Sequence, residues 1–442
     1  MPAPIPPAAR LQPLPAAAAV RDARGCRVSG ANARSLDRYE AALAASVAWR
    51  GGADVPLAQA LQESPGFVMA HVLKAYGLLL GRDVHRIRKA RAVLTDALRL
   101  RPAGGLLRRE RLHLAAAAAL LDDDYPGAKA LLGAVLHAEP RDLLALQAAH
   151  SLDYLTGDLA QLRDRVASVL HAWPAGTPGR HAVLAMRAFG LVERGEVAAG
   201  EDAAHAALAL NPLDARAHHA LAHGFEARGR AADGARWLRR HRHVWATSTA
   251  VATHCAWHLA LFHAASGAAT AALDLYDHAI APRTDAPELA DLIDASALLW
   301  RLELDGVPVG ARWPVLARAW APRIDDAYCS FADVHAMLAF VGARDGERAG
   351  ALEQALLAAR TRATRHGATT RTLGLPAARA LVAYGRGQDA LAVALLSGLR
   401  SEMHRLGGSH AQRDVLHLTL VHAAERIARR APRRQGLASV AR

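Results

Sequence analysis

Histidine and carboxylate side chains recur at helical spacing in two short stretches of the chain. His219, His223 and Glu226 lie three or four residues apart in HHALAHGFEARGR, and His254 and His258 lie four apart in HCAWH. Side chains at this spacing share one face of a helix. Histidine is the usual general acid or base near neutral pH and a common metal ligand. These faces therefore predict a polar groove wall, an acid–base site or a metal site.

The helices that carry these faces recur with the 34-residue period of tetratricopeptide repeats. With Pro212 at position 32 of one unit, small residues fall where the two helices of a unit cross, and the pattern runs from about residue 180 to 285. Bulk at those positions would push the helices apart. No segment alternates with the period of two that a strand shows. We therefore predict an all-α fold, a right-handed superhelix of stacked antiparallel helix pairs without a sheet.

Composition divides the chain into three parts. Residues 1–32 are rich in Pro and Ala and are expected to form a flexible tail. Helical patterns fill residues 33–428, and the basic residues 429–442 are expected to fray. Apolar residues make up 52% of the chain and aromatic residues only 5%, so Ala, Leu and Val must fill the core, which favours close-packed helices.

The charge and the cysteine content indicate which classes of partner and which cellular compartment to expect. The net charge of +13 comes almost wholly from arginine, without a dense basic run that contains aromatic residues, so no nucleic-acid partner is expected. The three widely spaced cysteines indicate a reducing compartment. The longest apolar runs are shorter than the ~20 residues of a membrane span. We expect a soluble cytoplasmic protein without a membrane partner.

The chain resembles the tetratricopeptide repeat protein 38 family over about residues 33–425. The resemblance rests on FVMAH (67–71), RRERLH (108–113), DLLALQAAH (142–150), FGLVE (189–193), HALAHGFE (219–226), HCAWHLAL (254–261), FADVH (331–335) and LGGSHAQRDV (406–415), among others. The last stretch is the most specific, because an ordinary repeat helix does not require it. The family implies a helical repeat fold and no established activity. This chain has Ser151 where family members carry Asp, and the resemblance leaves open whether Asp153 replaces that residue.

The repeat register predicts which side chains face the groove. In tetratricopeptide repeats, positions 2, 5, 9, 12 and 13 of the first helix point inward, and His219 and His223 take positions 5 and 9. The residues expected on the groove wall or in contact with a ligand are His71, His113, His150, His219, His223, Glu226, His254, Trp257, His258, Asp333, His335, His410, Arg413 and Asp414.

These observations predict a binding protein whose histidine-rich groove holds a peptide segment or a small anionic molecule. They are also compatible with a homo-oligomer. The alternative is a hydrolase or lyase that uses groove histidines as general acid and base, with Arg413 holding a carboxylate or phosphate. An enzyme would have a closed pocket of a few hundred Å³, and a scaffold a long open groove. The sequence does not decide between them.

No cofactor and no resident metal are expected. HALAH and HCAWH each offer two histidines four residues apart, which can chelate one ion. Neither stretch has the HExxH pattern, however, and the repeat register does not require the two pairs to face each other. Protein purified without a histidine tag should therefore hold less than stoichiometric zinc.

The C-terminal motif GGSHAQRDV is expected to close that end of the concavity. Ser409 can cap the helix that follows the two glycines. Arg413 is expected to point toward an acidic partner such as Asp294 or Asp333.

Overall fold

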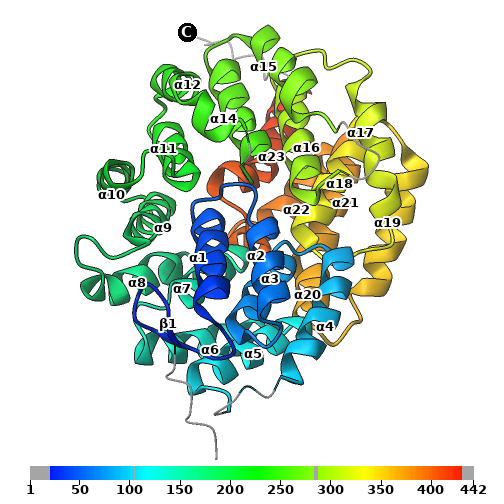
Figure 1. Cartoon of the computed structure of the whole chain (residues 1–442). Coiled ribbons are helices and arrows are strands. Elements are labelled where there is room, and N and C mark those ends of the chain that lie inside the picture. The colour runs from blue at the N-terminus through cyan, green and yellow to red at the C-terminus, as the bar shows by residue number, and fades with distance from the viewer. Residues whose placement is uncertain (1–19, 101, 103–104, 248, 283–286, 431–442) are drawn as a thin grey trace, which may run out of the picture.

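The protein is almost entirely helical in the part of the chain that its structure describes. The computed structural model describes residues 20–100, 102, 105–247, 249–282 and 287–430. Figure 1 shows helical hairpins that follow one another round the molecule.

The helices of the N-terminal half are α1 (Ala33–Val47), α2 (Asp54–Glu63), α3 (Val68–Leu79), α4 (Val84–Leu98), α5 (Arg108–Leu121), α6 (Tyr125–Ala138), α7 (Leu143–Leu155), α8 (Leu159–Val169), α9 (Arg180–Glu193), α10 (Val197–Leu210), α11 (Ala215–Ala227) and α12 (Ala231–Arg240). The C-terminal half has α13 (Arg242–Trp245), α14 (Ala252–Ala265), α15 (Ala269–Leu275), α16 (Leu289–Leu304), α17 (Arg312–Trp320), α18 (Ser330–Gly342), α19 (Gly346–Ala359), α20 (Arg365–Thr369), α21 (Leu375–Gly385), α22 (Asp389–Leu399) and α23 (His410–Arg430). Short 3-10 or π-helical turns cover Leu170–Ala172, Tyr276–Ile280, Ala321–Arg323, Thr370–Gly374 and Met403–Leu406.

Consecutive helices pair as antiparallel hairpins, for example α3 with α4, α9 with α10 and α21 with α22. The first helix of a pair also packs on the first helix of the next pair, as α9 does on α11, α14 on α16 and α18 on α21. These first helices are buried on nearly all sides, as α11 and α18 show, so they form the inner layer. The predicted all-α fold of stacked antiparallel helix pairs is confirmed.

Small residues let the helices of a pair cross closely. Gly200 of α10 lies against α9, where a Cβ atom would stand 3.0 Å from the carbonyl oxygen of Ala188 and 2.6 Å from Cγ2 of Val192. Gly200 and Ala188 occupy positions 20 and 8 of their repeat unit, the pair that the sequence pattern requires to be small.

The N-terminal segment contains a small hairpin that the sequence did not predict. Strand β1 (Val20–Arg21) pairs antiparallel with β2 (Arg27–Val28). In the turn between them, the buried Asp22 accepts the backbone N–H of Cys26, which is buried too. The predictions of a flexible tail and of no strand are therefore wrong from residue 20 onward, because Asp22 satisfies the turn. The preceding residues lie outside those described.

The C-terminal boundary also differs from the prediction. Helix α23 extends to Arg430, so the first two residues of the predicted basic tail are helical. Residues 431–442 lie outside the described part of the chain. Within that part, no helix combines the length and the apolar character that crossing a bilayer requires.

Distant segments of the chain meet across the interior. The contacts are from Arg82 to the carbonyl oxygen of Leu406 (3.3 Å), from Tyr154 Oη to Gln412 Oε1 (2.7 Å), from the Ala250 N–H to the carbonyl oxygen of Trp49 (3.0 Å), from the His366 N–H to Asp123 (2.7 Å), and from the His410 N–H to Glu193 (3.0 Å). Early, middle and late hairpins therefore enclose a common interior instead of forming an open array.

Candidate functional site

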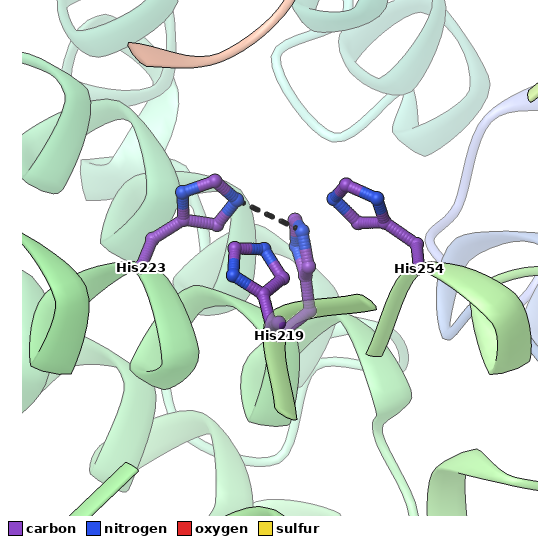
Figure 2. A group of neighbouring side chains, drawn as sticks. His219, His223 and His254 are labelled. Atoms are coloured by element: carbon purple, nitrogen blue, oxygen red, sulfur yellow. Dashed lines mark hydrogen bonds between the residues drawn. The ribbon is translucent and has the colours of Figure 1, made fainter. Parts of the chain in front are cut away.

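Four histidines from two inner helices form one cluster. Helix α11 contributes His219 and His223, and the neighbouring helix α14 contributes His254 and His258. The Nε2 atoms of His219 and His223 are 2.9 Å apart, and the ring of His258 lies 4.4 Å from that of His223 and 4.8 Å from that of His254. Figure 2 shows His223 and His254 pointing toward each other, with His219 between them. The repeat register did not require the histidine pair of α11 to face the histidine pair of α14. In the structure the two pairs face each other.

Burial keeps most of these imidazoles neutral. It lowers the pKa of His223 to about 3, with the neighbouring His258 as the next cause. Burial likewise holds the pKa values of His219 and His258 well below the usual range, and neighbouring histidines add to the effect. At neutral pH these rings therefore offer lone pairs rather than positive charges.

Carboxylate groups lie near the Nδ1 atoms of three of these rings. His254 Nδ1 hydrogen-bonds to Asp294 Oδ2 at 2.8 Å. His258 Nδ1 lies 3.5 Å from Glu226 Oε2, and His223 Nδ1 lies 3.7 Å from Glu193 Oε1. Such partners fix the orientation of a ring and the nitrogen that carries its proton.

An inner cavity of about 190 Å³ adjoins the cluster. Its walls are Trp49, His150, Ser151, Tyr154, Phe189, Arg216, His219, His223, Ala250, Val251, His254, Ala290, Asp294, Ser409 and Gln412. Most of these residues come from α7, α9, α11, α14, α16 and the start of α23, and Trp49, Ala250 and Val251 come from the segments after α1 and before α14, so parts of the chain distant in the sequence build one site. Two of the lining residues, Ala250 and Ala290, are exposed, so the cavity wall reaches the surface there.

Arg216 brings a buried positive charge to the inner cavity. It is 3% exposed, and its guanidinium carbon lies 4.5 Å from the ring centre of Trp49. Its Nε has no hydrogen-bond partner, and no described carboxylate lies within ion-pair distance of it. Burial lowers its pKa to about 10, against a raising effect of Asp214. Asp214 itself is engaged by His181, 2.6 Å away.

A larger outer cleft of about 560 Å³ lies on the other side of His223. The polar side chains that line it are Glu193, Arg194, His223, Glu226, His410 and Asp414. The 45% exposed side chain of Asp414 and the 64% exposed side chain of His410 show that this cleft faces solvent. Glu193 accepts a hydrogen bond from His410 Nδ1 at 2.9 Å, and this contact, together with His223, lowers the pKa of its carboxyl group despite its burial.

The structure brings some of the predicted groove residues together. His150, His219, His223 and His254 line the inner cavity, and Glu226, His410 and Asp414 line the outer cleft. His258 completes the cluster, and Trp257 stacks on His254 with 5.2 Å between ring centres, so Trp257 packs behind the site and does not line it.

Other predicted residues lie away from both cavities. His71 hydrogen-bonds to the carbonyl oxygen of Pro65, and the fully buried His113 pairs with Asp142 at 2.9 Å. Asp333 and His335 are buried in α18 and line neither cavity. Because the inner helices are buried on several sides, an inward position can face another helix instead of either cavity.

The C-terminal motif contributes to both cavities. Ser409 caps α23: its Oγ accepts the Gln412 N–H at 3.3 Å, and Gln412 Oε1 accepts the Ser409 N–H at 3.2 Å. Arg413 binds the carbonyl oxygen of Gly408 and lies 3.9 Å from Glu193. The expected partners of Arg413, Asp294 and Asp333, are therefore wrong.

Asp153, the nearest carboxylate to Ser151 in the sequence, lies away from the inner cavity. Asp153 is buried and forms ion pairs with Lys129 at 2.8 Å and with Arg165 at 2.6 Å, whereas Ser151 lines the inner cavity.

Sequence reasoning missed several residues at the site, and three of them occupy inward positions of the repeat. Arg216, Phe189 and Glu193 take positions 2, 9 and 13 of their repeat units, which are inward positions. The register that identified the histidines contained this signal, because it marks a position as inward whatever residue type occupies it.

The fold and the site define a tetratricopeptide-like helical repeat protein whose hairpins enclose an interior cavity. No protein-family model matches the chain, so the resemblance to the tetratricopeptide repeat protein 38 family stays a prediction. Among solved structures, the chain is similar to one in the crystal structure of the APC/C hetero-tetramer Cut9-Hcn1, with 13% identity and a TM-score of 0.39. The match covers 79% of this chain and 63% of that chain, less than two thirds of its length. This likeness is too distant to inform function.

Proposed function

We propose that the chain is a binding protein that holds a small anionic molecule in the inner cavity. The observation that carries the proposal is Arg216, a buried guanidinium that lines the cavity without a carboxylate partner among the described residues. A buried charge without a counter-charge is strongly unfavourable. A bound carboxylate or phosphate would supply the counter-charge, and guanidinium groups bind both with two parallel hydrogen bonds.

The size of the cavity favours a small molecule over a peptide segment. Sites for drug-sized ligands usually measure about 300–1,000 Å³, and the inner cavity measures about 190 Å³. Trp49, Tyr154 and Phe189 give it an apolar wall, whereas Ser409 and Gln412 add polar contacts. A short carboxylic acid or a small phosphate monoester fits this combination of size, charge and surface.

A hydrolase or lyase is the second candidate, and one contact favours it. His254 and Asp294 both line the inner cavity and share a 2.8 Å hydrogen bond. A carboxylate that orients a histidine is the usual arrangement of a general base. Arg216 would then position an anionic substrate beside His254.

The proposal can be tested with a panel of small carboxylic acids and phosphate monoesters. Thermal melting of the full chain should show that some members raise the melting temperature. Arg216→Gln should remove this shift, because the amide cannot replace the charge. Without ligand, Arg216→Gln should melt at the same temperature or higher, since removing a buried unpaired charge relieves a penalty of about 1–3 kcal/mol.

Arg236→Gln is the matched control, because it removes the same charge from a side chain that is 73% exposed. This variant should respond to the panel as the wild type does. The proposal fails if no compound shifts the wild type, or if Arg216→Gln keeps the full shift. Turnover of a bound compound that is lost in Asp294→Asn would favour the enzyme.

A further inference from the structure

The histidine cluster has more buried ring nitrogens than hydrogen-bond partners. His258 is fully buried, and its Nε2 has no partner, whereas its Nδ1 lies 3.5 Å from Glu226. Nδ1 of the buried His219 also lacks a partner. Buried polar atoms in folded proteins are nearly always satisfied, so such a concentration of exceptions calls for an unseen partner.

We propose that this cluster is a binding site for a divalent transition-metal ion, with one ring nitrogen from each of the four histidines as ligands. The four nitrogen atoms already lie within 4.8 Å of one another. A tetrahedral zinc ion with Zn–N bonds of about 2.0–2.1 Å needs its nitrogens about 3.3 Å apart. Small rotations of the rings, without movement of α11 or α14, can close this difference. Imidazole ligands suit zinc, copper, iron and nickel.

The surrounding carboxylates support a metal site independently of the ring nitrogens. Asp294, Glu226 and Glu193 stand 2.8, 3.5 and 3.7 Å from the Nδ1 atoms of three different histidines of the cluster. Histidine ligands of metals nearly always have such a partner at the other nitrogen, which directs the remaining lone pair toward the ion. Three negative charges also offset the two positive charges of the ion.

This site goes beyond the proposed function and does not depend on it. Three of its histidines, His219, His223 and His254, line the inner cavity, so an anion held by Arg216 would lie beside the ion. The expectation that the chain holds no resident metal rested on the two histidine pairs not having to face each other. The packing of α11 on α14 makes them face each other.

Zinc binding to the full chain tests the proposal directly. Protein without a histidine tag is stripped with a chelator, loaded with Zn²⁺, passed through gel filtration and analysed for metal. We expect about one tightly held zinc per chain. His223→Gln and His258→Gln should each lose it. His335→Gln is the control, because His335 is buried to a similar degree but lies outside the cluster.

Two further measurements separate a metal site from a structural role of the histidines. Co²⁺ in the wild type should give the visible absorption bands of a tetrahedral site, and His258→Gln should not. Asp294→Asn, which changes a positioning residue, should weaken zinc binding about 10–100-fold without abolishing it.

Arg216→Gln should retain its zinc even though it loses the response to anions, so the two proposals can fail separately. Sub-stoichiometric zinc in the loaded wild type would overturn the metal site, as would a full equivalent in both cluster variants. If those variants do not fold, the wild type decides alone: zinc must raise its melting temperature and a chelator must reverse the rise.

Discussion

One buried carboxyl group links the stability of this protein to pH between about 4 and 8. Asp333 lies in the first turn of α18 and is buried, and its Oδ2 has no hydrogen-bond partner. Burial raises its pKa to about 8, Asp326 adds to the rise, and Arg362 opposes it. The folded protein therefore keeps this carboxyl group protonated at neutral pH.

The substitution Asp333→Asn should reveal the stability linked to this proton. The unfolded chain releases the proton near pH 4 and the folded chain near pH 8, so the stability of the fold decreases as pH rises through this window. Asparagine cannot ionise. The stability of the variant relative to the wild type should be greater at about pH 8.5 than at about pH 5, by at least about 1–3 kcal/mol. Equal differences in melting temperature at both pH values would contradict this account.

At the scale of the elements, the crossing residues decide how closely two helices pack. Gly200 is buried at the crossing of α9 and α10, and the groups that a Cβ would meet include the backbone oxygen of Ala188, which cannot move independently of its helix. Gly350, in the middle of α19, is exposed, and a Cβ added there would have no neighbouring atom within 4 Å. The two glycines therefore separate the effect of packing from that of helix propensity.

Gly200→Ala and Gly350→Ala should change stability in opposite directions. The first should destabilise the protein by about 1–3 kcal/mol, because the added methyl forces the helices apart. The second should stabilise it by about 0.5–1 kcal/mol, because alanine favours the helix over glycine. Chemical denaturation of both variants measures the contrast. A stabilising Gly200→Ala would show that the crossing has spare room.

The repeat register predicted the elements and their inward positions better than it predicted the site. Periodicity and small crossing residues are local properties, so the helix pairs and the inward placement of His219 and His223 could be read from the sequence. The opposition of His254 to His223 depends on the packing angle between α11 and α14, which no local pattern encodes. The contact between Glu193 and His410 joins residues far apart in the chain, and no repeat pattern links them.

At the scale of the whole molecule, one buried acid helps to fasten the last helix to the middle of the chain. Glu193 at the end of α9 accepts the backbone N–H and the Nδ1–H of His410 and lies near Arg413. Its side chain is 2% exposed, whereas that of His410 is 64% exposed, so water screens the contact with the imidazole in part. The start of α23 therefore depends on a residue more than two hundred positions earlier.

Glu193→Ala should loosen this junction. Because Glu193 is buried but His410 is largely exposed, the loss should be about 1–3 kcal/mol, less than for a fully buried pair. Hydrogen exchange should increase most in the first turns of α23, with little change in α3 and α4. Glu353→Ala, which removes an exposed pair with Arg379, should cost less than about 1 kcal/mol. Uniformly faster exchange over the whole chain would argue against a local junction.

The meeting of early, middle and late hairpins also limits how this protein can evolve. An open array of repeats can gain or lose a unit at either end, because each repeat touches only its neighbours. Here one added hairpin between α1 and α23 would shift Trp49, Arg216 and Gln412 relative to one another and separate the walls of the inner cavity. The length of the array is therefore fixed by its site, as the number of blades is fixed in a closed propeller. Relatives that share the cavity should differ in their loops and outer helices, and should keep the same number of hairpins.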